Sequence, residues 1–113
     1  MPVLHDWRLR ECDSGQVNGA PCAKVHEDRA RRLTVPYPGG ESWTAAVARV
    51  AKFLRDVLWR WRGERILVVG HVATRWCSDR YIDGIPLDAL LDMDFAWQEG
   101  WEYRLAKQGS ADR

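Results

Sequence analysis

The sequence predicts an α/β fold, because a long amphipathic helix, a short apolar strand and a second helix follow one another in this order. Apolar residues at helical spacing indicate the first helix, namely Val47, Val50, Ala51, Leu54, Val57, Leu58 and Trp61. Its charged residues are expected on the other faces: Arg49, Lys52, Arg55, Asp56 and Arg60. The continuous apolar run Ile66 to Val69 is typical of a parallel strand buried on both faces, and His71 to Tyr81 is predicted to be helical.

The residues before this unit predict less regular structure. Val3 to Leu9 is expected to form a short strand or an extended arm, and Arg10 to Ala20 a loop. Pro21 suits the first position of a short polar helix that runs to Arg32. Pro36 to Gly40 then breaks the chain, and Ser42 supplies a capping hydroxyl for the long helix.

The residues after this unit predict a short helix, an edge strand and a tail. Asp83-Gly84 ends the second helix, and Pro86-Leu87 opens a further turn or short helix. Gly100 to Leu105 alternates apolar and polar residues, as an edge strand does, and Gln108 to Arg113 is a polar tail. Two or three strands are few for an independent sheet, so part of the domain is expected to be absent.

Composition predicts one small soluble globular domain. The chain has 113 residues, a net charge of +1 and 46% hydrophobic residues. A net charge this small gives no general attraction to nucleic acid. No apolar run reaches the roughly 18 residues that span a membrane. The first residues do not resemble a targeting segment, and three cysteines without a CxxC pair fit reduced thiols. We therefore expect a cytoplasmic protein.

Two patterns that suggest other ligands have simpler explanations. Cys22 and His26 would share a helix face, where His5 and Cys12 could join them, but no second spaced pair supports a metal site. The alternation Trp59-Arg60-Trp61-Arg62 resembles nucleic-acid stacking platforms, yet helical periodicity turns its aromatic and basic residues to different faces. We expect neither a metal nor a nucleic acid.

Gly70-His71 is the clearest candidate for chemistry. In open α/β sheets, ligands bind beyond the carboxyl ends of strands, where helix amino termini present unpaired N–H groups. Gly70 allows a sharp turn there, and His71 at the start of the next helix could donate a hydrogen bond or positive charge to a phosphoryl oxygen. The alternative is a histidine that merely caps the helix.

A wider pattern favours the interpretation of His71 as a phosphate-binding residue. Four stretches occur in one specific order: Trp7-Arg8-Leu9-Arg10-Glu11, Pro38-Gly39-Gly40-Glu41-Ser42, Leu67-Val68-Val69-Gly70-His71 and Phe95-Ala96-Trp97-Gln98-Glu99-Gly100-Trp101-Glu102-Tyr103. Together they resemble the histidine phosphatase superfamily, which includes phosphoglycerate mutases and broad-specificity phosphatases, from about residue 3 to residue 105. The last stretch looks most like the phosphatase branch. The resemblance implies a three-layer α/β/α, phosphoglycerate-mutase-like domain that lacks its first strands, over residues 1–107, followed by a tail at 108–113.

The resemblance also implies site roles. Glu11 matches the family's acidic proton donor, and His71 matches its second histidine, which helps to bind the phosphate. The family's Arg-His-Gly, whose histidine attacks phosphorus, does not occur in this sequence, nor does the segment with its phosphate-clamping arginine. From the residues alone, Glu11 could instead be a solvated carboxylate beside Arg8 or Arg10, and Arg75 could reach either an anion or solvent.

Two residues depart from the family pattern. Ser14 stands where mutase-type members usually have a tyrosine, which argues against mutase substrate handling. Val72 follows the histidine where a small residue is common, and a valine there either narrows the space beside the phosphate or packs against the sheet.

Two functional hypotheses follow. In the first, the intact protein is a phosphomonoesterase that works without a cofactor, binds a small phosphorylated substrate and forms a phosphohistidine intermediate. In the second, the chain is a catalytically dead remnant that acts as a binding or interaction module, or is a gene fragment. Loss of the opening strands would then expose Ile66 to Val69, so the remnant should associate, for instance as a swapped homodimer.

Overall fold

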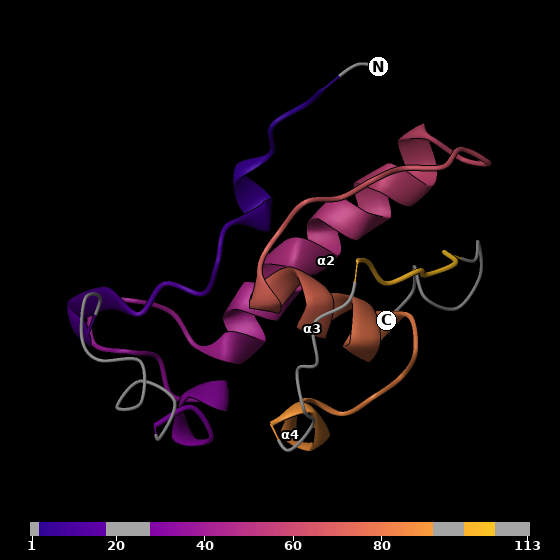
Figure 1. Cartoon of the computed structure of the whole chain (residues 1–113). Coiled ribbons are helices and arrows are strands. Elements are labelled where there is room, and N and C mark those ends of the chain that lie inside the picture. The colour runs from indigo at the N-terminus through magenta and orange to yellow at the C-terminus, as the bar shows by residue number, and fades with distance from the viewer. Residues whose placement is uncertain (1–2, 18–27, 92–98, 106–113) are drawn as a thin grey trace.

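The computed structural model describes residues 3–17, 28–91 and 99–105, and its regular elements in these ranges are helices (Figure 1). The α-helices are α2 (Trp43–Arg60), α3 (Val72–Tyr81) and α4 (Leu87–Leu90). Single 3₁₀ turns are η1 (Trp7–Leu9), η2 (Gly15–Val17) and η3 (Arg31–Leu33). The long helix α2 forms the base, and α3 and η1 pack against it.

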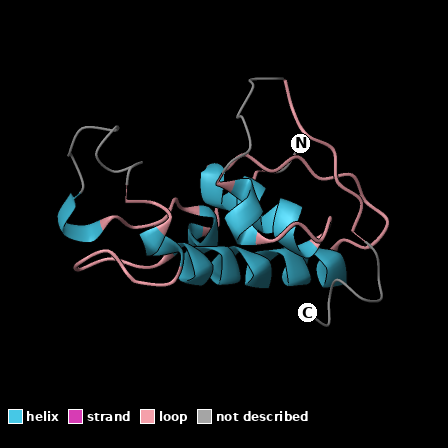
Figure 2. Ribbon diagram, turned by 90° about the horizontal axis from the view of Figure 1, so that it is seen from below, coloured by secondary structure: helices cyan, strands magenta, loops and turns pink. Residues whose placement is uncertain are grey.

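The predicted α/β fold, with its three-layer α/β/α arrangement, is wrong for the described residues. No strand occurs in 3–17, 28–91 or 99–105, as the absence of magenta in Figure 2 shows. Ile66 to Val69 is extended but unpaired, with Leu67 81% and Val69 80% exposed instead of buried. Gly100 to Leu105 likewise forms no strand. A strand needs a neighbour for its backbone N–H and C=O groups, and no described segment takes that place.

Helix α2 forms where periodicity and capping predict it. Ser42 is its N-cap, with Oγ accepting a hydrogen bond from the Ala45 N–H at 3.1 Å. The predicted stripe is buried at Val47, Val50, Ala51 and Val57 and half-buried at Leu54 and Leu58. Trp61 is an exception, because α2 ends at Arg60 and the Trp61 side chain is 37% exposed.

The core lies between α2 and α3. The rings of Trp43 and Trp76 meet at 4.7 Å between centroids, tilted by 48°. Cys77 and Ala73 are fully buried beside them, and Leu90 of α4 closes the cluster. The predicted helix over His71 to Tyr81 and the short helix after Pro86 are both confirmed, with α3 starting one residue later than predicted.

Arg49 contradicts its predicted place on a solvent-facing side of α2. Its side chain is only 8% exposed. Nη1 donates to the carbonyls of Arg8 and Arg10, both at 2.8 Å, and Nη2 donates to the Glu11 carbonyl at 3.2 Å. Nη2 also forms an ion pair with the Glu41 carboxylate. The guanidinium is buried because this loop offers carbonyls that lack helix or strand partners.

The main chain of the loop that contains Glu11 is hydrogen-bonded to the main chain of the turn that precedes α2. The Glu41 N–H donates to the Asp13 carbonyl at 2.9 Å. A Cβ on Gly40 would lie 2.2 Å from that same carbonyl oxygen, and one on Gly15 would lie 2.2 Å from the Pro38 oxygen. Gly15 also has a φ of 57°, which favours glycine. Both glycines are therefore required for this close approach.

The other predictions for the first residues and the tail are met only in part. Val3 to Asp6 has no regular structure, and the predicted arm ends in η1. Of the predicted helix Pro21 to Arg32, residues 21–27 lie outside the described ranges, and Arg31–Leu33 is a 3₁₀ turn. The predicted tail at 108–113 also lies outside them.

Replacing Arg49 with methionine should destabilise the protein by about 3 kcal/mol, because the half-buried Glu41 carboxylate and the loop carbonyls lose their donor. Urea unfolding monitored by circular dichroism measures the change. Lys52→Met, on the exposed part of the same helix, is the matched control and should change stability by no more than about 0.5 kcal/mol. Equal effects of the two substitutions would contradict the role assigned to Arg49.

Gly40→Ala should cost about 1–3 kcal/mol, because the added methyl group collides with backbone that cannot move independently. Thermal unfolding provides the measurement. Gly100→Ala is the control, since a Cβ there meets no heavy atom within 4 Å. If both alanine variants unfold at the wild-type temperature, the close packing of the two loops is not required.

Candidate functional site

Glu11 lies against the amino terminus of α3. Its Oε1 accepts hydrogen bonds from the Ala73 N–H at 2.9 Å and the Cys12 N–H at 3.0 Å, and its Oε2 accepts one from the Val72 N–H at 3.2 Å. The positive end of the helix dipole attracts a negative charge at this point. The structure thus brings Glu11 to the helix that begins directly after His71, although the two residues are far apart in the sequence.

His71 is the N-cap residue of α3 and its side chain is exposed. Its carbonyl accepts hydrogen bonds from the N–H groups of Thr74 and Arg75 at 3.1 and 3.2 Å, and its own N–H donates to Thr74 Oγ1 at 3.2 Å. A Cβ on Gly70 would lie 2.2 Å from that hydroxyl oxygen. The main chain of His71 is therefore held firmly, while its imidazole faces solvent.

The segment around Glu11 is anchored from behind. Arg49 binds the Glu11 carbonyl, and the Glu41 carboxylate that Arg49 pairs with also accepts the Asp13 N–H at 3.0 Å. Burial raises the pKa of the adjacent Cys12 thiol to about 12, and the Glu41 and Glu11 charges add to this shift. Cys12 therefore remains a neutral thiol that packs in the core, and it is a poor nucleophile.

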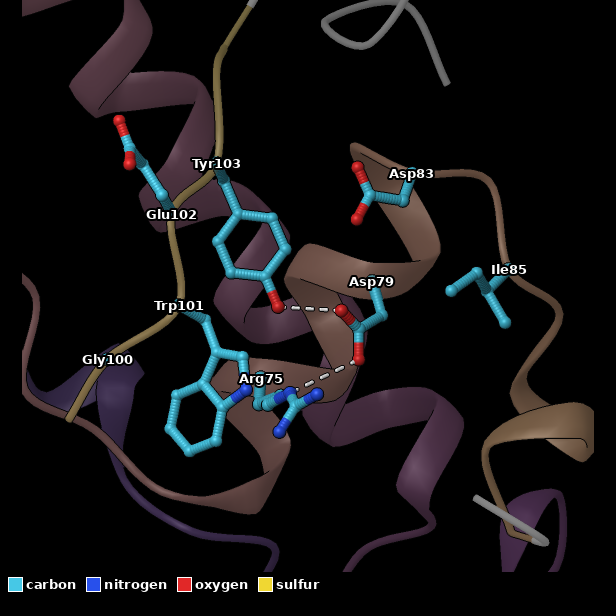
Figure 3. A pocket seen from close by; sticks show the side chains of 8 residues that line it. All are labelled: Arg75, Asp79, Asp83, Ile85, Gly100, Trp101, Glu102 and Tyr103. Atoms are coloured by element: carbon cyan, nitrogen blue, oxygen red, sulfur yellow. Dashed lines mark hydrogen bonds and ion pairs between the residues drawn. The ribbon is translucent and has the colours of Figure 1, made fainter. Parts of the chain in front are cut away.

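Arg75, one turn after His71, is held by protein groups. Its guanidinium lies over the Trp101 ring at 4.1 Å from the centroid, and Nε is 3.5 Å from Asp79 Oδ2. The Tyr103 hydroxyl donates to Asp79 Oδ1 at 2.6 Å (Figure 3). Burial raises the pKa of Tyr103 to about 12, with the Asp79 hydrogen bond adding to the shift, so the phenol stays protonated at neutral pH. The sequence left open whether the Arg75 side chain reaches an anion or solvent. In the structure it contacts Trp101 and Asp79, and it is 19% exposed.

A cavity of about 380 Å³ lies between α3 and the segment after Glu99. Figure 3 shows the residues that line it: Arg75, Asp79, Asp83, Ile85, Gly100, Trp101, Glu102 and Tyr103. The volume is within the usual range for small-molecule sites. The cavity lies beside α3, the helix whose N-cap is His71, and its lining residues come after His71 in the sequence.

The arrangement around α3 can bind an anion and exchange a proton. The exposed imidazole of His71 can donate to an oxyanion, as can the N–H groups of Val72 and Ala73 that now hold Glu11. A carboxyl group such as Glu11 can transfer a proton to or from a bound oxygen. Ser14 and Val72, the two departures from the family pattern, are both half-buried.

Neither a metal nor a membrane span is found in the ranges described. Within 3–17, 28–91 and 99–105, no three His, Cys, Asp or Glu side chains are placed to hold a metal ion together. Cys22 and His26, the spaced pair in the sequence, lie outside the described residues. Of the helices in those ranges, none combines the length and apolar character needed to cross a bilayer.

Sequence reasoning did not single out Arg49, Glu41, Asp79 and Tyr103. A signal existed for Arg49, which comes three residues after the buried Ala46 and directly before Val50, so it borders the apolar stripe of α2. No comparable signal marks Asp79, whose partner Tyr103 was assigned to an edge strand. Only the folded chain places those two side chains together.

Comparison with known proteins gives one family and one relative. Residues 1–101 match the family described as the histidine phosphatase superfamily (branch 1). The chain is 31% identical over 115 residues to a 2,3-bisphosphoglycerate-dependent phosphoglycerate mutase of Methylobacterium sp. (strain 4-46), covering 93% of this chain and 55% of that protein. It thus spans about half the length of this relative. No solved structure matches the chain.

The family match extends over the segments that carry Glu11, the Arg49 anchor and His71, and it ends at Trp101 in the cavity wall. The resemblance seen in the sequence motifs is confirmed. The chain belongs to the histidine phosphatase superfamily, branch 1.

Proposed function

We propose that this chain carries the proton donor and the phosphate-stabilising histidine of a phosphomonoesterase that forms a phosphohistidine intermediate. The observation that carries the proposal is the contact of the Glu11 carboxylate with the first N–H groups of α3, directly after the exposed His71. The attacking histidine, which the family has in an Arg-His-Gly motif, would come from residues outside this sequence.

The reaction proceeds in two displacements at phosphorus. The attacking imidazole forms a P–N bond as the P–O bond to the alcohol breaks, and Glu11 gives its proton to the departing oxygen. Water then attacks the phosphohistidine, the P–N bond breaks, and a proton from that water returns to Glu11. His71 donates to a phosphoryl oxygen in both steps, which stabilises the negative charge of the transition state.

Glu11 must exchange its hydrogen-bond partners to act as the acid. Phosphoryl oxygens accept hydrogen bonds as the carboxylate does, so a bound phosphomonoester competes with Glu11 for the Val72 and Ala73 N–H groups. Release from one of them frees a carboxyl oxygen for the leaving group. The anchor at Arg49 keeps the Glu11 backbone in place during this exchange.

Hydrolysis is proposed here in preference to the mutase activity named for the relative. Two sequence features support this choice, namely Ser14 in place of a tyrosine and the phosphatase-like stretch from Phe95 to Tyr103. A mutase retains the phosphoryl group for a second alcohol, whereas a phosphatase passes it to water. Release of inorganic phosphate compared with isomerisation of a phosphoglycerate separates the two activities.

A binding module without catalysis is the second candidate function. The observation that favours it is the high exposure of Leu67 and Val69, two large apolar side chains in an unpaired segment. An exposed apolar segment of this kind stabilises association with another chain.

The test of the first proposal is an assay of the chain alone and of a completed form, in which a family-type segment with Arg-His-Gly precedes residue 3. The completed form should release phosphate from phosphomonoesters, and the chain alone should have activity lower by about 10⁶, as expected when a nucleophile is missing. His71→Ala in the completed form should lower kcat/KM by about 10²- to 10³-fold. An inactive completed form that is correctly folded would leave the binding module as the function.

Glu11→Gln in the completed form should slow hydrolysis of alkyl phosphates by about 10²- to 10⁴-fold, because an alkoxide needs a proton to depart. Hydrolysis of 4-nitrophenyl phosphate should change much less, since its leaving group is a stable anion. The ratio of the two kcat values measures the acid role. The glutamine still offers an acceptor to the Ala73 N–H, so a purely structural role would lower both rates equally.

A further inference from the structure

The cavity beside α3 shares a helix face with His71. Residues 71, 75 and 79 are four apart, so their side chains follow one another along one side of the helix. Arg75 is the wall residue that follows His71 most closely in the sequence, and Asp83 follows the end of the helix. From Arg75 to its end at Tyr81, the helix rises by roughly 9 Å at 1.5 Å per residue. A ligand whose phosphoryl group is bound at His71 would extend into this space.

The walls combine apolar surface with a few fixed polar groups. Trp101, Tyr103 and Ile85 supply the apolar surface. The Trp101 ring is fixed by Arg75, and the Tyr103 ring is fixed by its hydrogen bond to Asp79 (Figure 3). Flat rings held in this way favour an aromatic or aliphatic body over a strongly hydrated one.

The charge in the cavity is negative at the end away from His71. Arg75 and Asp79 neutralise one another as an ion pair. Asp83 and Glu102 are exposed, and neither has an ion-pair partner within the part of the chain that the structure describes. In Figure 3 the Glu102 carboxylate points away from Asp79, so Asp83 is the main source of negative charge facing a ligand. A carboxylate placed beside it would be repelled.

We propose that this cavity binds the alcohol part of the phosphomonoester and selects cationic or uncharged alcohols with an aromatic or apolar body over alcohols that carry a carboxylate. The inference rests on the proposed phosphatase function, which it deepens by naming the substrate class. Glycerate-type leaving groups are disfavoured by the same charge. The Arg75 end accommodates the alcohol oxygen, and the Asp83 end accommodates the cationic group.

The test uses three phenols with one skeleton: tyramine as the cation, 4-ethylphenol as the neutral compound and 3-(4-hydroxyphenyl)propionate as the anion. Each is titrated into the ¹⁵N-labelled chain, and the indole N–H signal of Trp101, identified by its loss in Trp101→Phe, reports binding. Tyramine should bind most tightly and the propionate most weakly, with Kd values about tenfold apart or more.

Asp83→Asn should reduce the preference for tyramine over 4-ethylphenol by about threefold to fivefold, the effect of removing one exposed charge. Asp88→Asn removes an exposed carboxylate on α4 outside the cavity and should leave all three Kd values unchanged. Equal Kd values for the three phenols, or shifts that avoid Trp101, would overturn the inference.

Binding of free alcohols requires no attacking histidine, so this experiment and the phosphatase assay can fail separately. Selective binding at Trp101 with an inactive completed form would reject the proposed function and leave a cavity with the stated selectivity. An active completed form that prefers carboxylate-bearing phosphomonoesters would instead reject the selectivity and leave the phosphatase function in place.

Discussion

The buried guanidinium of Arg49 is the interaction on which the rest of the structure depends. It connects α2 to a segment that has little regular structure, and it satisfies three backbone carbonyls and one carboxylate at once. A lysine could not do this, because its single ammonium group lacks the planar fork of donors. The position of Glu11, and through Glu11 the amino terminus of α3, follows from this anchor. A buried charge thus adds to the limited apolar packing that this segment supplies through Cys12.

Glu11 connects stability to the proposed chemistry. Its carboxylate caps α3 in the structure described, and the same carboxylate is the proposed acid. The N–H groups that hold it are the donors that a phosphoryl group would use. In the proposed reaction, substrate binding and helix capping would therefore compete for one set of donors. The cost of releasing the cap would be offset because an oxyanion of the substrate would replace the carboxylate at the same positive helix end.

The local features of this fold were predictable from sequence, and the non-local ones were not. Ser42 and the stripe through Val47 and Val50 predicted α2, because capping and helical periodicity depend on residues a few positions apart. The strand predicted at Ile66 to Val69 failed because strand pairing needs a distant neighbour, which the apolar pattern cannot reveal. The burial of Arg49 was missed for a similar reason, since its three carbonyl acceptors lie about forty positions earlier. The strand-to-helix pattern singled out His71, the family resemblance singled out Glu11, and the catalytic roles of both stay predictions.

Two of the hydrogen bonds that join the Glu11 loop to the turn before α2 are made by peptide groups alone. The Gln16 N–H donates to the Pro38 carbonyl, and the Glu41 N–H donates to the Asp13 carbonyl. The Asp13 side chain has a structural role, because its Oδ1 accepts a hydrogen bond from the Gly15 N–H at 2.8 Å, whereas the side chains of Gln16 and Pro38 are exposed. Variation at residues 16 and 38 can therefore alter the surface around the site without breaking these bonds, provided that Gly15 and Gly40 remain. Geometry and specificity are encoded by different atoms of the same short segment.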